Sequence, residues 1–276
     1  MTSLVGTPAG RTRAARPRTA GRAALLRVLL PFSLLAVLAL AWELAARTGA
    51  VAPNLLPAPS RILEQAFLHG DVLWSHTFPT LTATVVGFSS AVVVAFLLAT
   101  ALDFSGILRL SVLPLLVVSQ TLPIVALAPL VVLWFGFGLL PKVLLVALVT
   151  FFPMTIAFLQ GFASTDADAT RLLRSLGAGR MREFVTLRLP SAVPSFFAGL
   201  RISITYAVVG AIFAEYAGAT SGLGVFMQSS KSAFRTDLVL SAVLVCSVLT
   251  LLLYGLVLVI EHLSTPWLRV SRGAGR

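Results

Sequence analysis

Charged residues are scarce in this sequence, at 11% of 276 positions, which is less than about half the share in an ordinary soluble domain. Apolar residues make up 58% of the chain, and the mean hydropathy is +0.96. This balance excludes a disordered chain and argues against a water-soluble enzyme. We therefore predict an all-α protein embedded in a membrane.

The sequence also has little that could hold a metal or a nucleotide. Cys246 is its one cysteine and lies in an apolar run, so no disulfide framework or cysteine metal site is expected. The three histidines, His69, His76 and His262, form no cluster. No G-x-x-x-x-G-K-[ST] phosphate loop occurs, so ATP is not expected to bind here by that route. We predict no catalytic residue, no metal and no cofactor bound by this chain.

The formal charge of +11 would suit a nucleic-acid partner, but the positions of the basic residues argue against one. Six basic residues crowd the N-terminal tail: Arg11, Arg13, Arg16, Arg18, Arg22 and Arg27. Other basic residues lie in short segments between apolar stretches, which is typical of membrane topology.

Six stretches are apolar enough to cross a bilayer, which takes about 20 residues. In the third stretch Pro114, Pro123 and Pro129 each remove a backbone donor, so we expect a kinked or interrupted helix. The predicted spans are 25–46, 77–102, 110–135, 139–162, 191–217 and 236–262.

The distribution of Lys and Arg predicts that both termini are cytoplasmic. With the N-terminus inside, the cytoplasmic side holds the tail arginines, Arg109, the arginines of the 163–190 loop and those after residue 268. The outer side then receives Arg47, Arg61, Lys142, Lys231 and Arg235.

The expected organisation is a basic tail (1–24), one integral membrane domain (25–268) and a short C-terminal tail (269–276). The first span also resembles a cleaved secretory signal. Its apolar run from Leu25 to Trp42 is longer than a usual signal core, and Glu43 interrupts it before any cleavage site. We therefore expect it to be kept as a span.

The 163–190 loop has the pattern of a helix, a glycine turn and a second helix. Thr165 followed by Asp168 resembles a capping box, and Asp166 adds negative charge at the helix start. The turn is predicted at Gly177-Ala178-Gly179. Apolar residues recur at helical spacing on both sides: Leu172, Leu173 and Leu176 before the turn, and Met181, Phe184, Val185 and Leu189 after it, ahead of Pro190.

Three interpretations of this hairpin follow from the pattern. It could be a plain connection between spans, an amphipathic element on the lipid headgroups, or a docking element for a partner. The pattern alone does not choose among them.

The spacing of Gly177, nine residues, Leu187, one residue and Leu189-Pro190 resembles the EAA signature of ATP-binding-cassette (ABC) importer permeases. Flanking residues 174–178, 189–195 and 199–202 resemble the nitrate/sulfonate/taurine branch, and the likeness covers about residues 55–268. It implies a type I importer permease fold, an inner-membrane location and a homodimer of permeases. The implied partners are cytoplasmic ATPase subunits, which hold ATP and Mg, and an external solute-binding protein facing the outer loops 47–76 and 218–235.

The resemblance implies that residues of the hairpin couple the permease to the ATPase. Arg171 stands where the signature has glutamate, and Leu172 and Leu173 stand where it has alanines, so a charged contact would need Asp168 or a partner of reversed charge. The predicted coupling residues are Asp168, Arg171, Leu172, Leu173, Ser175, Gly177, Ala178, Leu187, Leu189 and Pro190.

Two solute classes stay open: a thiamine pyrimidine precursor, or a sulfonate-, taurine- or nitrate-like solute. The segments 119–129 and 133–142 resemble permeases for thiamine pyrimidine precursors, but sulfonate and taurine permeases share Trp134-Phe135-Gly136. Candidate residues of the translocation path or gate are the polar groups at membrane depth: Gln120, Thr121, Ser203, Tyr206 and Glu215.

The fifth span has small residues at every fourth position, which predicts a close-packing face or a face lining the passage. These residues are Gly199, Ser203, Ala207 and Ala211. Arg201 is expected to snorkel to the cytoplasmic side, and Glu215 is the better candidate for an outer gate. The lack of a central acidic relay argues against the alternative function, an ion-gradient-driven secondary carrier.

Overall fold

The computed structural model describes residues 19–49, 52 and 55–266. Within these ranges every regular element is a helix. The chain divides into two compact units, Met1–Ser60 and Arg61–Arg276, and each is described by itself.

In the first unit, α1 (Thr19–Arg47) covers the first predicted span. Its described side chains include exposed Leu34 and Leu38, as expected of a helix surrounded by lipid. At its end the Glu43 carboxylate accepts hydrogen bonds from Ser60 N (3.0 Å) and Ser60 Oγ (2.7 Å). Residues 1–18 of the predicted basic tail, and the whole predicted C-terminal tail, lie outside the described residues.

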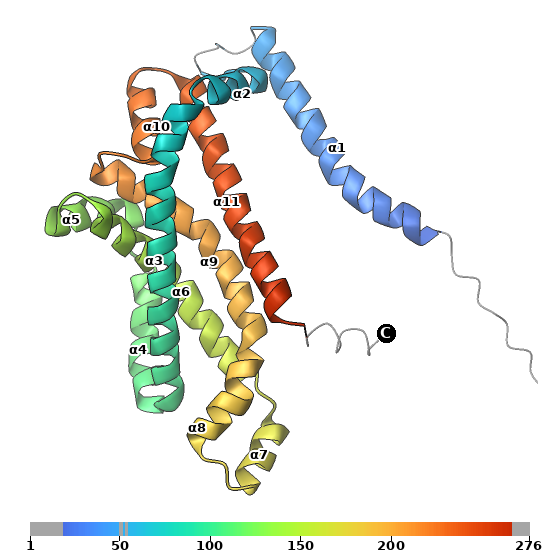
Figure 1. Ribbon diagram of the computed structural model, residues 1–276, viewed down its shortest axis with the longest axis vertical. Coiled ribbons are helices and arrows are strands. Elements are labelled where there is room, and N and C mark those ends of the chain that lie inside the picture. Colours follow the sequence, from blue (N-terminus) through green and yellow to red (C-terminus); the bar gives the residue numbers. More distant parts are fainter. Residues whose placement is uncertain (1–18, 50–51, 53–54, 267–276) are drawn as a thin grey trace, which may run out of the picture. The chain divides into compact units, whose positions relative to one another are not determined.

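The second unit is built on three helices that pack closely through small residues. Figure 1 shows α3, α6 and α9 side by side, and the contacts of α6 with α9 and with α3 are the most extensive between helices of this unit. The helices after α1 are α2 (Pro59–Leu68), α3 (Gly70–Phe104), α4 (Gly106–Ser119), α5 (Ile124–Phe135), α6 (Leu139–Ala163), α7 (Ala167–Ser175), α8 (Arg180–Glu183), the π-helical turn η1 (Phe184–Arg188), α9 (Leu189–Gly218), α10 (Leu223–Ser232) and α11 (Thr236–Ser264).

Glycines bring the three helix backbones together. A Cβ added to Gly161 on α6 would lie 2.8 Å from Ala192 Cα on α9. A Cβ added to Gly87 on α3 would lie 2.6 Å from Val146 Cβ on α6. Because apolar side chains gain nothing by leaving lipid, such close packing is what holds helices together in a bilayer.

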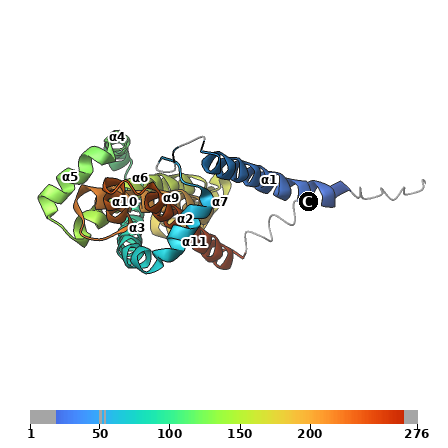
Figure 2. The same cartoon turned by 90° about the horizontal axis from the view of Figure 1, so that it is seen from above.

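The third predicted span is interrupted, as its prolines indicate. The axes of α4 and α5 meet at 100° across a break of four residues (Figures 1 and 2). Pro123 ends the break, because the residue before a proline is forced out of the helical region. Pro114 and Pro129 lie inside α4 and α5, so only Pro123 coincides with the break.

Among the described residues, four helices are long and apolar enough to cross a membrane: α3, α6, Arg180–Gly218 and α11. The bent α4–α5 pair adds a fifth if it counts as one span. The chain is thus a multi-pass, all-helical membrane protein, and the six-span count stays a prediction.

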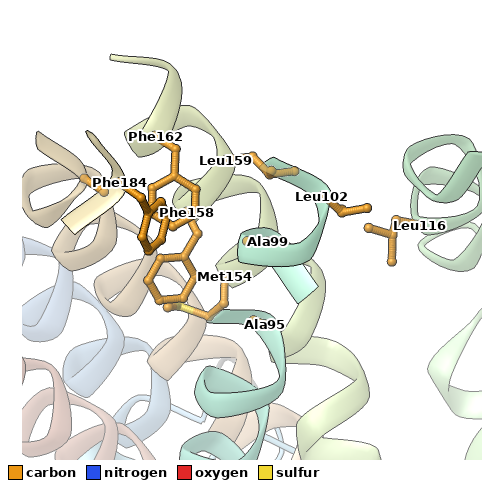
Figure 3. Close-up of a cluster of buried hydrophobic side chains, with 10 residues drawn as sticks. Ala95, Ala99, Leu102, Leu116, Met154, Phe158, Leu159, Phe162 and Phe184 are labelled. Carbon is orange, nitrogen blue, oxygen red and sulfur yellow. The ribbon is translucent and has the colours of Figure 1, made fainter. Parts of the chain in front are cut away.

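A cluster of aromatic and aliphatic side chains joins α3, α6 and η1 (Figure 3). Phe162 of α6 and Phe184 of η1 meet edge to face, with ring centroids 5.2 Å apart. Ala99 and Leu102 of α3 close the cluster, and both are fully buried. The segment that follows the glycine turn is therefore anchored in the core of the second unit.

Candidate functional site

The 163–190 loop forms the predicted helical hairpin, with one change at its start. Asp166, not Thr165, caps α7: its carboxylate accepts a hydrogen bond from Asp168 N at 2.8 Å. Thr165 Oγ1 instead donates to the carbonyl of Phe162. An aspartate is as good a cap as a threonine, and here Asp166 holds the extended backbone that a cap requires.

The glycine turn ends α7 as predicted. Gly177 has φ +79°, a left-handed conformation that a side chain would disfavour. The Gly177 and Ala178 amides then donate to the carbonyls of Arg174 (2.9 Å) and Leu173 (3.2 Å). These bonds satisfy carbonyls at the helix end and turn the chain into α8.

The second half of the hairpin is not a separate helix, which corrects the prediction. From Arg180 to Gly218 the chain is one helical segment of 39 residues, so the second helix of the hairpin and the predicted span 191–217 are continuous through Pro190. The π-helical turn explains the difference: Leu189 N donates to Phe184 O, five residues back, and the wider turn accepts the following proline, which has no N–H to donate. The second half of the hairpin is therefore continuous with α9.

The predicted coupling residues divide into exposed and inward-facing sets. The predicted residue Leu172 of α7 is 64% exposed, and Leu176, which caps the end of α7 and was not among the predicted coupling residues, is 73% exposed. Met181 and Val185, also four residues apart, are exposed on the second helix. Leu189 packs against the core cluster of Figure 3, Leu173 and Leu187 are half-buried, and Ser175 and Pro190 are exposed. The hairpin thus leaves two apolar pairs uncovered.

A buried carboxylate locks the hairpin to the spans. Glu183 accepts hydrogen bonds from Arg174 Nε (2.8 Å) and from Arg188 Nε and Nη2 (3.0 and 2.8 Å). Arg188 Nη1 also donates to both oxygens of Asp103, at the end of α3, at 2.7 and 2.9 Å. The hydrogen bond to Glu183 raises the pKa of Arg174, so this group stays charged. We call Arg174, Glu183, Arg188 and Asp103 the hairpin network.

At the position of the signature glutamate, Arg171 is paired within its own helix. Its Nη2 lies 2.8 Å from Asp168 Oδ1, and both side chains are exposed. The two residues that could carry a charged contact to a partner therefore neutralise each other in this chain.

Two of the predicted path residues line one cavity of about 580 Å³. Gln120, at the α4–α5 break, and Tyr206 of α9 contribute to its wall, together with residues of α6. Ser203 does not: it is fully buried, and its Oγ donates to Thr150 O on α6. The Thr121 hydroxyl donates to Val118 O in its own turn and is not part of the wall.

The small-residue face of α9 packs inside the bundle. Ser203, Ala207 and Ala211 are fully buried, and a Cβ on Gly199 would collide with Ala157 of α6. Arg201 does not snorkel alone, because it forms an ion pair with Glu261 of α11.

Glu215 lies at the far end of α9, in a site assembled from α3, α6 and α10. Its carboxylate accepts hydrogen bonds from Gly224 N and Thr80 Oγ1, both at 2.8 Å, and lies 3.7 Å from Lys142 Nζ. Gly222 has φ +135°, and a Cβ there would overlap the carboxylate. We call Glu215, Lys142, Thr80 and the α10 amides the α10 network.

Sequence reasoning missed the partners in both networks. Lys142 was assigned to the outside as one basic residue among several, and Glu183 was not singled out. A usable signal existed in the topology: adjacent antiparallel spans bring the first turn of one beside the last turn of the other. Lys142 near the start of α6 and Glu215 near the end of α9 meet this condition.

Comparison with known proteins gives one consistent picture. Residues 91–270 match the family model of the binding-protein-dependent transport system inner membrane component. The chain is 34% identical to the formylaminopyrimidine transport permease protein ThiX of Halalkalibacterium halodurans, over 87% of this chain and 96% of that protein. It is 31% identical to the taurine transport system permease protein TauC of Escherichia coli, over 87% and 90%. A crystal structure of an amino acid ABC transporter with histidines matches with a TM-score of 0.60 at 16% identity, covering 72% of this chain and 96% of that one, which concerns the fold alone.

Proposed function

The chain belongs to the family of binding-protein-dependent transport system inner membrane components, and we propose that its α7–α8 hairpin is the surface through which an ATPase drives it. It is the permease subunit of an ABC importer, which works with ATPase subunits and a substrate-binding protein. ATP hydrolysis lies in the separate ATPase, and we assign ATP and Mg to that partner and no cofactor to this chain.

The observation that carries the proposal is the double character of the hairpin. Outward, Leu172 of α7 and Leu176, the residue that caps its end, are exposed at i, i+4 spacing. Inward, the buried Glu183 carboxylate holds guanidinium groups from both halves of the hairpin. A plain connection between spans needs neither feature. An element that transmits movement from a partner needs both an exposed apolar surface for binding and a rigid attachment to the spans.

Two paths carry a displacement of the hairpin into the bundle. The covalent path is the unbroken helix from Arg180 to Gly218. The second path is Arg188, whose guanidinium joins Glu183 to Asp103 at the end of α3. Because α3 and α9 both pack on α6, they can move as a group when the hairpin is pushed.

In this proposal the surface that binds the ATPase is apolar. The family signature has a glutamate where this chain has Arg171, and Arg171 is neutralised by Asp168. Leucines that lose their exposure in a complex contribute about 1.5–3 kcal/mol each. The exposed leucines of α7 can therefore supply the affinity that a charged contact would otherwise give.

Topology and assembly complete the proposal. Six spans arise if α1 is the first and the bent α4–α5 pair counts as one. Asp103, Arg188 and the hairpin would then face the cytoplasm with both termini, while Lys142, Glu215 and α10 would face the outside and the binding protein. A second identical copy would complete the permease. The solute is a small organic molecule, either a thiamine pyrimidine precursor or a sulfonate.

The test compares Leu176→Asp with the matched control Leu176→Met in the complex with the ATPase and binding protein, reconstituted in vesicles. Leu176→Asp should lower solute-stimulated ATP hydrolysis at least about tenfold, because a desolvated carboxylate replaces an apolar contact. Leu176→Met should keep most of the activity. Full coupled activity in Leu176→Asp, or uptake driven by an ion gradient in vesicles with this chain alone, would overturn the proposal.

A further inference from the structure

The cavity beside the α4–α5 break has a wall of unusual chemistry for a place inside a membrane domain. Its polar groups are the amides of Gln120 and Gln160, the hydroxyl of Ser195 and the phenol of Tyr206. The rest of the wall is apolar and includes the ring of Phe152. Its volume of about 580 Å³ falls in the range of small-molecule sites.

No charged residue belongs to this wall. The nearest charge along α9 is Arg201, next to Ile202 of the wall, and its guanidinium is paired with Glu261 on α11. An anion entering the cavity would find no counter-ion in its wall to offset any water that it loses, which disfavours a charged group there. The cavity is therefore built for an uncharged solute.

The polar groups of the wall are available to a ligand. In the part of the chain that the structure describes, the side chains of Gln120, Gln160, Ser195 and Tyr206 have no hydrogen bond to another protein group, and each is at least partly exposed. Each amide offers two donor hydrogens and one acceptor oxygen. Two amides and two hydroxyls match a molecule with several donors and acceptors along its edges.

Aromatic groups add a preference of shape. Phe152 and Tyr206 belong to the same wall, on α6 and α9, and an aromatic ring offers a flat face for stacking. A flat heteroaromatic ring with amine, amide or ring-nitrogen edges uses both features. An aliphatic sulfonate uses neither, since it has no flat face and brings a full negative charge.

We propose that this cavity binds an uncharged, planar nitrogen heterocycle and discriminates against sulfonates. The inference rests on the proposed function, because it makes the cavity a stage of solute passage. It selects the pyrimidine class from the two classes left open above, and it assigns Gln160 and Ser195 to solute recognition beside the predicted Gln120 and Tyr206.

The experiment measures equilibrium binding to the purified complex of this chain with its ATPase, without the binding protein. The probes are radiolabelled 4-amino-5-(formylaminomethyl)-2-methylpyrimidine and taurine, at pH 8, where the pyrimidine is uncharged. The pyrimidine should bind saturably and at least about tenfold more tightly than taurine, because zwitterionic taurine brings two full charges and the wall has no charged residue to pair with either.

Two variants at one position sharpen the test. Gln160→Leu should weaken pyrimidine binding about tenfold, because it removes hydrogen bonds and leaves ligand groups unsatisfied. Gln160→Lys should weaken the pyrimidine and strengthen taurine, because it supplies a counter-ion. The matched control is Gln228→Leu, an exposed amide on α10 outside the cavity, which should leave both affinities unchanged.

The outcomes separate this inference from the proposed function. Equal or tighter binding of taurine to the unmodified complex, or an unchanged pyrimidine affinity in Gln160→Leu, would overturn the inference while the hairpin test above stands. Loss of the hairpin's role with the binding pattern intact would overturn the coupling proposal alone.

Discussion

The two ends of α9 use the same chemistry, carboxylates paired with cations, in different surroundings. In the α10 network the Glu215 carboxylate is fully buried and Lys142 is 9% exposed. In the hairpin network Glu183 is as deeply buried, but Arg174 is 59% exposed and Arg188 is 28% exposed. Glu183 and Glu215 lie about 48 Å apart along the helix, at a rise of about 1.5 Å per residue.

This difference separates a fixed joint from an adjustable one. Glu215 is held by a backbone amide of α10, whose position is fixed by its helix, and by the hydroxyl of Thr80 on α3, which is fully buried. Glu183 is held by long guanidinium side chains that water can reach, so these bonds can break and re-form. A transporter that alternates between states needs adjustable contacts, such as those of Glu183, at the proposed site of ATPase binding. It needs fixed contacts, such as those of Glu215, where helices must keep their relative positions.

The largest expected effect tests the fixed joint. Lys142→Met should lower the free energy of unfolding by about 3–5 kcal/mol, because it leaves the Glu215 carboxylate buried without its counter-ion. The measurement is equilibrium denaturation of the purified chain in detergent.

The matched control for this prediction removes the second charge as well. The double variant Lys142→Met/Glu215→Gln should regain most of the lost stability, because no charge is then left buried. If the single variant were as stable as the parent chain, or if the double variant were worse than the single one, Glu215 would not depend on Lys142.

The breaks in the helices were partly predictable from the sequence. Pro114, Pro123 and Pro129 together predicted the interrupted span, because a proline affects its neighbours locally, although only Pro123 lies at the break. The glycine turn of the hairpin was predictable for the same reason. The continuity of the helix through Pro190 was not predicted, because the π-helical turn that accommodates this proline depends on how Phe184 packs in the core.

Long-range partners escaped the sequence for a different reason. Asp103 and Arg188 are far apart in the chain. From the sequence alone, an acidic residue at the end of one span could pair with a basic residue at the end of any other span. The choice depends on which helices are neighbours, which the packing of small residues decides. The predicted path residues illustrate the same point: Ser203 and Tyr206 are three residues apart, yet one is buried between helices and the other lines the cavity.

The second prediction tests the adjustable joint. Glu183→Gln should cost only about 1 kcal/mol in stability, because the guanidinium groups keep their access to water and Arg188 keeps Asp103. It should lower coupled ATP hydrolysis several-fold, since α7 would lose its ion pair with the second half of the hairpin and could move without α9. The measurement is solute-stimulated ATPase activity beside a melting curve of the same complex.

A matched control exists in the same segment. Arg182→Gln changes an exposed residue next to Glu183, outside the hairpin network, and should leave both quantities near those of the parent chain. A loss of stability in Glu183→Gln as large as that in Lys142→Met would mean that both joints are fixed.

The smallest expected effect concerns Arg171, which stands outside both networks. Its ion pair with Asp168 is exposed on both sides, at 77% and 85%, so water and salt screen it. Arg171→Ala should shift Tm by about 1 °C or less. It should also leave coupled ATP hydrolysis within about twofold of the parent, because the proposed contact is made by leucines and a twofold change is under 0.5 kcal/mol. Differential scanning fluorimetry and the ATPase assay measure the two quantities on one preparation. A loss of coupling comparable to that of Leu176→Asp would mean that the arginine itself touches the ATPase, and the restoration of coupling by a partner of altered charge would then identify the contact.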